Sequence, residues 1–186
     1  MLELRIHGRG GQGVVTMADI LSKAALAAGK EAHAMPFFGV ERRGAAIRAC
    51  VRIGDRPILL RSMSYQPDMV ALMHENMLSY ARQEGFTEGQ DGAVLIVNGK
   101  TPVEAKGVQW LVDAEQIART HDLVLAGDVY INVPMSGAIS KVMGIPLEAV
   151  ETAVREIWPG DRATPNLAAV RDAYEQTAIV KGGSEA

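Results

Sequence analysis

The alternation of apolar and polar residues starts at the N-terminus and predicts two elements. Across residues 2–7, Leu and Ile alternate with Glu, Arg and His, a period of two that is typical of a β-strand. Residues 14–28 contain only two charged side chains, Asp19 and Lys23, which lie four positions apart and so share one helix face. A helix with a large apolar surface is therefore expected there, ending at Gly29.

The same patterns continue along the chain. Residues 47–60 are expected to form a β-hairpin, because residues 47–53 alternate, Gly54 and Asp55 can turn, and Ile58 begins a returning apolar run. Further strands are expected over residues 30–37, 67–73, 92–99 and 108–113, and helices over 74–86, 114–122, 132–144, 145–160 and 163–178.

This order predicts an α/β fold, a layered single domain with a mostly parallel, Rossmann-like sheet flanked by helices and an inserted β-hairpin. No linker divides the chain. We expect the domain to span residues 1–180 and residues 181–186 to form a frayed tail.

Composition narrows the class of protein. The chain has 186 residues, 48% of them apolar and 22% charged, which is ordinary for a globular domain with its own core. A net charge of −3 gives no support to nucleic-acid binding. The N-terminus is charged where a signal peptide is apolar, and no apolar run approaches the roughly 20 residues of a membrane span. We therefore expect a cytoplasmic protein without membrane insertion.

Few residues are candidates for a catalytic or metal-binding role. Cys50 is the single cysteine, so the chain cannot form an internal disulfide or supply the ligands of an iron–sulfur cluster. Cys50 lies in an alternating strand and is expected to be a structural thiol. The four histidines show no metal-ligand spacing, and no nucleophile–base arrangement is evident. Neither a metal site nor a catalytic residue is predicted on this chain.

A glycine-rich loop separates the first strand from the first helix. Its glycines satisfy the pattern G-x-G-x-x-G, which allows close backbone approach and leaves the helix N-terminus open to an anion. A dinucleotide site also needs an acid at the end of the second strand, whereas Glu31 lies at its start. A phosphate contact to another ligand and a tight packing turn both remain open. The candidate residues are Gly8, Arg9, Gly10, Gly11, Gln12 and Gly13.

A second loop follows the second strand and carries Glu41, Arg42 and Arg43. In an open α/β sheet this loop is expected beside the glycine loop, where the arginines could clamp a phosphate or carboxylate. An ion pair that stiffens the loop against a neighbouring subunit is the alternative. Asn132 precedes a predicted helix and is interpreted first as its N-cap, with Ser136 sharing that role.

Three motifs carry a resemblance to a known family. "GRGGQGV" at 8–14, "FFGVERRGA" at 37–45 and "NVPMSGAISKVMGI" at 132–145 together resemble the gamma subunit of 2-oxoacid:ferredoxin oxidoreductases of the pyruvate synthase type. The resemblance covers nearly the whole chain. Val40 stands where the family usually has proline, and Phe37-Phe38 where it often has tyrosine, so the particular 2-oxoacid stays open.

The resemblance implies a function for a multi-subunit enzyme. Such enzymes convert a 2-oxoacid and coenzyme A to acyl-CoA and CO2 and pass electrons to ferredoxin or a related acceptor. Thiamine diphosphate with Mg and [4Fe-4S] clusters are then expected on partner subunits of alpha, beta and delta type. This chain would support assembly and help position coenzyme A. The glycine loop, the Glu41–Arg43 loop and Asn132 are then candidates for contact either with coenzyme A or with a partner chain.

The second loop resembles the pyruvate and aryl or branched-chain side of the family, which includes phenylglyoxylate enzymes, more than the 2-oxoglutarate side. An accessory subunit should also expose a large apolar surface that its partners cover. The alternative is a stand-alone Rossmann-type dinucleotide-binding protein.

Overall fold

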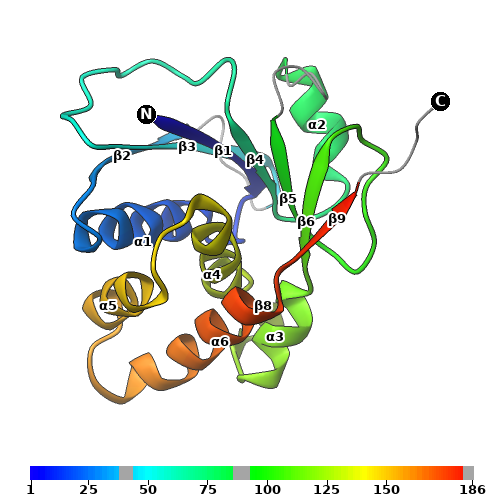
Figure 1. Ribbon diagram of the computed structural model, residues 1–186. Coiled ribbons are helices and arrows are strands. Elements are labelled where there is room, and N and C mark those ends of the chain that lie inside the picture. The colour runs from blue at the N-terminus through cyan, green and yellow to red at the C-terminus, as the bar shows by residue number, and fades with distance from the viewer. Residues whose placement is uncertain (38–43, 86–92, 182–186) are drawn as a thin grey trace.

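A single twisted sheet forms the centre of the molecule in the computed structural model, which describes residues 1–37, 44–85 and 93–181 (Figure 1). Its strand order is β2-β3-β1-β4-β5-β6-β9. The strands are β1 Leu2–Arg9, β2 Glu31–Phe37, β3 Ala46–Gly54, β4 Met69–Leu72, β5 Val94–Asn98, β6 Val108–Val112 and β9 Ala178–Lys181. A separate two-stranded hairpin consists of β7 Val124–Leu125 and β8 Asp128–Val129.

The pairing makes the sheet mixed but mostly of one direction. β1, β4, β5 and β6 pair in parallel, while β3 is antiparallel to both of its neighbours, β1 and β2. β9 runs antiparallel to β6 and covers that edge. β2 therefore runs in the same direction as β1, and only β3 and β9 oppose the rest. The predicted mostly parallel α/β domain is confirmed.

Most helices lie on one face of the sheet (Figure 1). This layer contains α1 Val14–Ala27, α3 Ala114–Thr120, α4 Asn132–Met143, α5 Leu147–Ile157 and α6 Ala163–Gln176. A short 3-10 turn, η1 Gly160–Arg162, precedes α6, and α2 Met77–Gln83 lies on the other face. The main core fills the space between sheet and helix layer, with Leu4, Ile6, Met17, Ile139 and Val150 fully buried.

Two helices of this layer approach each other closely. A Cβ atom added to Gly137 in α4 would lie 2.4 Å from the carbonyl oxygen of Val170 in α6. No side chain can occupy that space, so glycine at position 137 sets the separation of the two backbones.

The predicted helices and strands are largely confirmed, with three corrections, one of which is the unpredicted β7–β8 hairpin. The hairpin expected over residues 47–60 does not form, because β3 pairs with β1 and β2 on its two sides and leaves no edge for residues 58–60. β9 was not predicted. It includes Lys181, where the frayed tail was expected to begin, and residues 182–186 lie outside the described part of the chain.

The strand order reverses between β1 and β4. From β1 the chain turns through α1 to β2 and β3 on one side, whereas β4, β5 and β6 follow on the other. Open α/β sheets bind ligands at the carboxyl ends of the strands at such a reversal. The glycine loop leaves β1 at this point. Across the described ranges, no helix is long and apolar enough to cross a membrane.

Candidate functional site

The glycine loop is held in a tight turn by its own residues. Gly11 and Gly13 have φ values of 94° and 72°, in the left-handed region that favours glycine. The Arg9 amide donates to Oε1 of Gln12 at 2.7 Å, and the Gln12 amide donates to the Arg9 carbonyl at 3.0 Å. The Gln12 side chain therefore closes the turn from within.

Gly8 allows close packing of neighbouring elements at the end of β1. A Cβ atom at this position would lie 2.6 Å from Cγ2 of Val14 and 2.9 Å from Cγ of Met73. The first glycine of the pattern thus allows α1 and the β4–α2 connection to close on the end of β1. The interpretation as a packing turn therefore accounts for Gly8.

The N-terminus of α1 remains open to a ligand. Its N-cap is Gly13, no side chain caps it, and its first turn contains no acidic residue. The first helical hydrogen bond runs from the Met17 amide to the Gly13 carbonyl at 2.9 Å. The amides of residues 14–16 therefore have no acceptor within the helix. Together with the helix dipole, they favour an anion here.

The second loop rejoins the fold next to the first. The Gly10 amide donates to the Ala45 carbonyl at 2.8 Å, and the Gly44 amide donates to the Gly10 carbonyl at 3.1 Å. Nη1 of Arg9 also donates to the Gly44 carbonyl at 3.1 Å. The end of the second loop thus contacts the glycine loop. Glu41, Arg42 and Arg43 themselves lie outside the described residues.

Asn132 lies against the glycine loop and does not cap α4. The N-cap of α4 is Ile131 and receives no side-chain hydrogen bond, so the N-cap interpretation of Asn132 is wrong. A Cβ atom on Gly13 would lie 2.7 Å from Cγ and Nδ2 of Asn132. Asn132 is 4% exposed, and its Oδ1 has no hydrogen-bond partner. Ser136 does not cap the helix either, because its hydroxyl donates to the Asn132 carbonyl at 2.8 Å.

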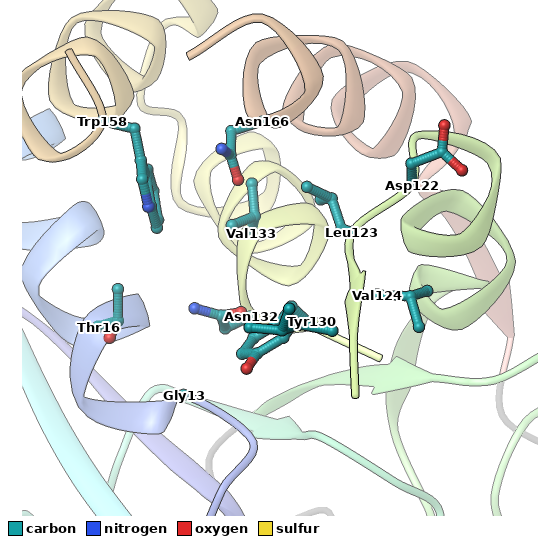
Figure 2. Close-up of a pocket in the computed structure, with 11 residues that line it drawn as sticks. Gly13, Thr16, Asp122, Leu123, Val124, Tyr130, Asn132, Val133, Trp158 and Asn166 are labelled. Atoms are coloured by element: carbon teal, nitrogen blue, oxygen red, sulfur yellow. The ribbon is translucent and has the colours of Figure 1, made fainter. Parts of the chain in front are cut away.

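A cavity of about 310 Å³ opens beside this contact (Figure 2). Glycine-loop and α4 residues form one side, the β7–β8 hairpin another, and the α5–α6 connection the third. The residues lining it are Gly13, Thr16, Asp122, Leu123, Val124, Leu125, Tyr130, Asn132, Val133, Trp158 and Asn166. Neither Trp158 nor Asn166 can be assigned to this cavity from the sequence, because both come from the distant α5–α6 segment.

The sheet order separates the second strand from the glycine loop. In a dinucleotide-binding fold the second strand lies next to the first, so that its terminal acid reaches the ribose. Here β3 lies between β1 and β2, and Glu31 is the first residue of β2. The geometry therefore does not support the dinucleotide alternative.

The sheet face away from α1 carries buried polar residues. His7 is fully buried without a hydrogen-bond partner on either ring nitrogen. Burial, with the nearby Arg5 and Arg48 charges, lowers the pKa of His7 to about 3. Burial also raises the pKa of the Cys50 thiol, which disfavours its reactive thiolate. Within the described residues, no three His, Cys, Asp or Glu side chains are grouped to hold a metal ion.

Comparison with known proteins places this geometry in a family. A sequence profile described as "Pyruvate ferredoxin/flavodoxin oxidoreductase" matches residues 3–176. The chain belongs to this family. It is a gamma-type subunit of a 2-oxoacid:ferredoxin oxidoreductase, as the three motifs implied.

Similar proteins of this family match over almost their full length. The chain is 39% identical to the "Pyruvate/ketoisovalerate oxidoreductases common subunit gamma" of Thermococcus litoralis, covering 96% of this chain and 98% of that protein. It is 40% identical to the "Pyruvate synthase subunit PorC" of Methanocaldococcus jannaschii, covering 95% and 97%.

Solved structures of this family share the fold. The crystal structure of the pyruvate oxidoreductase subunit PORC of Thermotoga maritima gives a TM-score of 0.81 at 34% identity and covers 97% of this chain and 98% of that one. The 2-oxoglutarate:ferredoxin oxidoreductase of Magnetococcus marinus, with 2-oxoglutarate, coenzyme A and succinyl-CoA bound, gives 0.75 at 17% identity. That match covers 99% of this chain and 32% of the longer protein, and it shows similarity of fold alone.

Proposed function

We propose that this gamma-type chain serves an enzyme that joins a 2-oxoacid to coenzyme A and releases CO2. The bond between the oxo carbon and the carboxylate breaks, and the thiol sulfur of coenzyme A becomes bonded to the resulting acyl group. Two electrons pass to ferredoxin or a related acceptor, and one proton is released. Family membership and the name of the Thermococcus relative support this reaction class.

The role of this chain in that reaction is to contact coenzyme A. The observation that carries the proposal is the uncapped start of α1 at the reversal of strand order, where the first backbone amides have no acceptor within the helix and no side-chain cap. Coenzyme A is rich in phosphate, the chemical group such a site favours. The second loop contacts the glycine loop, which leads into α1, through Gly44 and Ala45.

The redox and decarboxylation cofactors belong to partner chains in this proposal. A [4Fe-4S] cluster requires several thiolates, and this chain has one cysteine, Cys50, which is buried in β3. We therefore assign thiamine diphosphate with Mg and the clusters to alpha-, beta- and delta-type subunits. When bound there, thiamine diphosphate supplies the carbanion chemistry and the clusters supply electron transfer.

A charge placed at the start of α1 tests the contact with coenzyme A. Val15 is 41% exposed in the first turn of α1, so it can be replaced without disturbing the core. In the assembled complex, Val15→Glu is expected to raise the KM for coenzyme A about three- to tenfold, because a carboxylate repels the phosphates. Val15→Lys should lower it. Steady-state kinetics with saturating 2-oxoacid measure both.

The same helix offers the control. Leu26 is 55% exposed near the opposite end of α1, about 16 Å away along the axis. Leu26→Glu makes the same charge change beyond the Debye length and should leave the KM for coenzyme A unchanged. Equal values of this KM for Val15→Glu and Val15→Lys would contradict a phosphate site at the start of α1.

Arg42 and Arg43 remain candidates from the sequence. If either contacts a phosphate, its replacement by alanine should raise the KM for coenzyme A about 10- to 100-fold while the complex stays assembled. Dissociation of the complex would instead favour the subunit-interface alternative. Size-exclusion chromatography of each variant separates the two outcomes.

The substrate proposal is pyruvate or a branched-chain or aryl 2-oxoacid. The sequence of the second loop supports it, as do relatives named for pyruvate and ketoisovalerate. Feeding the purified complex with pyruvate, 2-oxoisovalerate, phenylglyoxylate or 2-oxoglutarate tests it. A preference for 2-oxoglutarate would contradict this assignment.

A further inference from the structure

The cavity beside Gly13 has the composition of a binding site for a planar ring. Trp158 and Tyr130 stand at opposite sides of it, and Leu123 and Val133 also line it (Figure 2). Its volume of about 310 Å³ lies at the lower end of the range for small-molecule sites, which are mostly apolar with few polar groups. The shape and lining suit a heteroaromatic base.

Two carboxamides supply the polar groups. Nδ2 of Asn166 donates to the Arg162 carbonyl at 2.8 Å, which leaves Oδ1 as an acceptor turned toward Val133 (Figure 2). Asn132 lines the cavity opposite and is 4% exposed, with its Nδ2 on the side of Thr16 and Trp158 (Figure 2). One side therefore offers a carboxamide acceptor and the other a carboxamide donor, the two kinds of group that a heteroaromatic edge can pair with.

We propose that this cavity binds the adenine base of an adenine nucleotide. The adenine edge offers an amino donor next to a ring-nitrogen acceptor, and an asparagine carboxamide can pair with both. Guanine presents two adjacent N–H donors that a carboxylate would match. Asp122, the acid among the lining residues, has its carboxylate turned away from Asn132 and Asn166 (Figure 2).

The rest of the nucleotide has a route out of the cavity. Gly13 borders the cavity and is also the N-cap of α1, so a ligand with its base between Trp158 and Tyr130 can direct phosphates to the open amides of that helix. The adenine can come from coenzyme A, in which case the inference rests on the proposed function. A free adenine nucleotide that regulates the enzyme is the other source.

Tryptophan fluorescence of the full chain tests the site directly. The chain has two tryptophans, and Trp110→Phe leaves Trp158 as the reporter. We expect ADP and coenzyme A to change Trp158 emission saturably, and GDP to bind at least tenfold more weakly. No saturable change with ADP or coenzyme A, or equal affinity for GDP and ADP, would overturn the proposal.

Substitution of Asn132 in the same background adds a second readout. Asn132→Asp keeps the side-chain size but removes the donor, and it should weaken ADP binding about ten- to hundredfold. Asn76→Asp makes the same change at an exposed residue before α2, outside the cavity, and should leave ADP binding unchanged. Equal ADP affinity of Asn132→Asp and the parent chain would count against the site even if ADP binds.

Inhibition kinetics of the assembled complex identify the source. Competitive inhibition by ADP against coenzyme A assigns the cavity to the adenine of coenzyme A, whereas non-competitive inhibition assigns it to a free nucleotide. The two proposals can fail separately. An ADP response of Trp158 with no charge effect at Val15 leaves the adenine site standing without the phosphate contact. A charge effect at Val15 without an ADP response of Trp158 supports the phosphate contact and excludes the adenine site.

Discussion

At the scale of single residues, the burial of His7 makes the stability of the folded protein depend on pH. His7 is buried beside Tyr80 in a T-shaped arrangement, with ring centroids 6.1 Å apart, and close to the charges of Arg5 and Arg48. A charged imidazole there would have no partner and two like charges nearby. The folded protein therefore keeps His7 neutral at every pH above about 3.

This burial predicts a loss of stability in acid. The pKa of His7 is about 3 when folded and 6.5 in the unfolded chain, so between these values the unfolded state binds one more proton. From pH 7.5 to pH 5 the free energy of unfolding should fall by about 2 kcal/mol through His7 alone. His7→Leu should remove that part of the fall, measured by urea unfolding at both pH values. An identical fall in the variant would contradict it.

The sequence showed some of the candidate site at this scale and missed the rest. The glycine pattern and Asn132 were both singled out, but their contact depends on Gly13 having no Cβ, which only the folded backbone shows. Trp158 and Asn166 reach the cavity from a segment more than 140 residues after Gly13. No local pattern encodes such a meeting, because tertiary packing alone brings these residues together.

At the scale of elements, the contact between α4 and α6 depends on Gly137. Gly137→Ala would place a methyl group 2.4 Å from the Val170 carbonyl oxygen, a backbone atom that cannot move without displacing α6. We expect the free energy of unfolding to drop by about 1–3 kcal/mol. Gly99→Ala is the matched control, since its nearest contact would be 3.7 Å and its φ is not positive. Chemical denaturation of both variants checks the difference, and equal stability would contradict the close packing.

Glu151 in α5 joins that helix to α6 through Arg171, and it also pairs with Arg155 one turn further along α5. Its carboxylate accepts hydrogen bonds from Nε of Arg171 and from Nη2 of Arg155, the latter at 2.9 Å. The Arg171 hydrogen bond, followed by that of Arg155, lowers the pKa of Glu151. The stabilisation is therefore complete above the ordinary pKa of 4.5 and is lost as pH falls through the lower folded value.

Replacing this carboxylate by an amide tests its contribution. Glu151→Gln should lower the free energy of unfolding by about 1 kcal/mol at pH 7, because both arginines are half exposed and solvent screens them. Below pH 4 the difference from the parent chain should shrink, as measured by urea unfolding. A difference that persists unchanged in acid would point to lost packing.

Elements were predictable wherever local pattern and tertiary pairing agree. The strand of residues 2–9 and the helix ending before Gly29 follow from periodicity and a C-terminal glycine with φ of 75°. The residues 47–60 hairpin failed because a turn signal at Gly54-Asp55 cannot show that both edges of β3 are already paired. β9 is four residues long and forms only because the edge of β6 is available.

At the scale of the whole molecule, one extended segment stands out as a surface for a partner. This arm, residues 55–66, lies over the polar face of the sheet and is attached to the rest of the chain at several points, including an ion pair between Asp55 and Lys30. Nη1 of Arg52 donates to the Leu60 carbonyl at 3.3 Å, and the Ser64 hydroxyl contacts the Glu3 carboxylate. Three of its large apolar side chains are exposed, Leu59 at 85%, Tyr65 at 76% and Leu60 at 45%, whereas Ile58 is buried.

Such exposure in a gamma-type subunit predicts that the arm is buried on assembly. A hollow of about 340 Å³ next to Leu59, lined by Met1 and residues 54–60, provides a place for a partner's side chain. Charged residues at the centre of an interface disrupt it, whereas the folded chain should tolerate them at exposed positions. The double variant Leu59→Glu, Tyr65→Glu should therefore fold normally by circular dichroism and fail to retain the larger subunits in co-purification.

The control for this last prediction is Leu26→Glu, an exposed apolar position in α1 on the opposite side of the sheet from the arm. Leu26→Glu adds one negative charge, where the arm variant adds two, and it should leave the subunit stoichiometry of the purified complex unchanged. Retention of all subunits by the arm variant would exclude the arm from the interface. If the arm variant instead loses partners while still giving the ADP response of Trp158, assembly and nucleotide binding occupy separate faces of this chain.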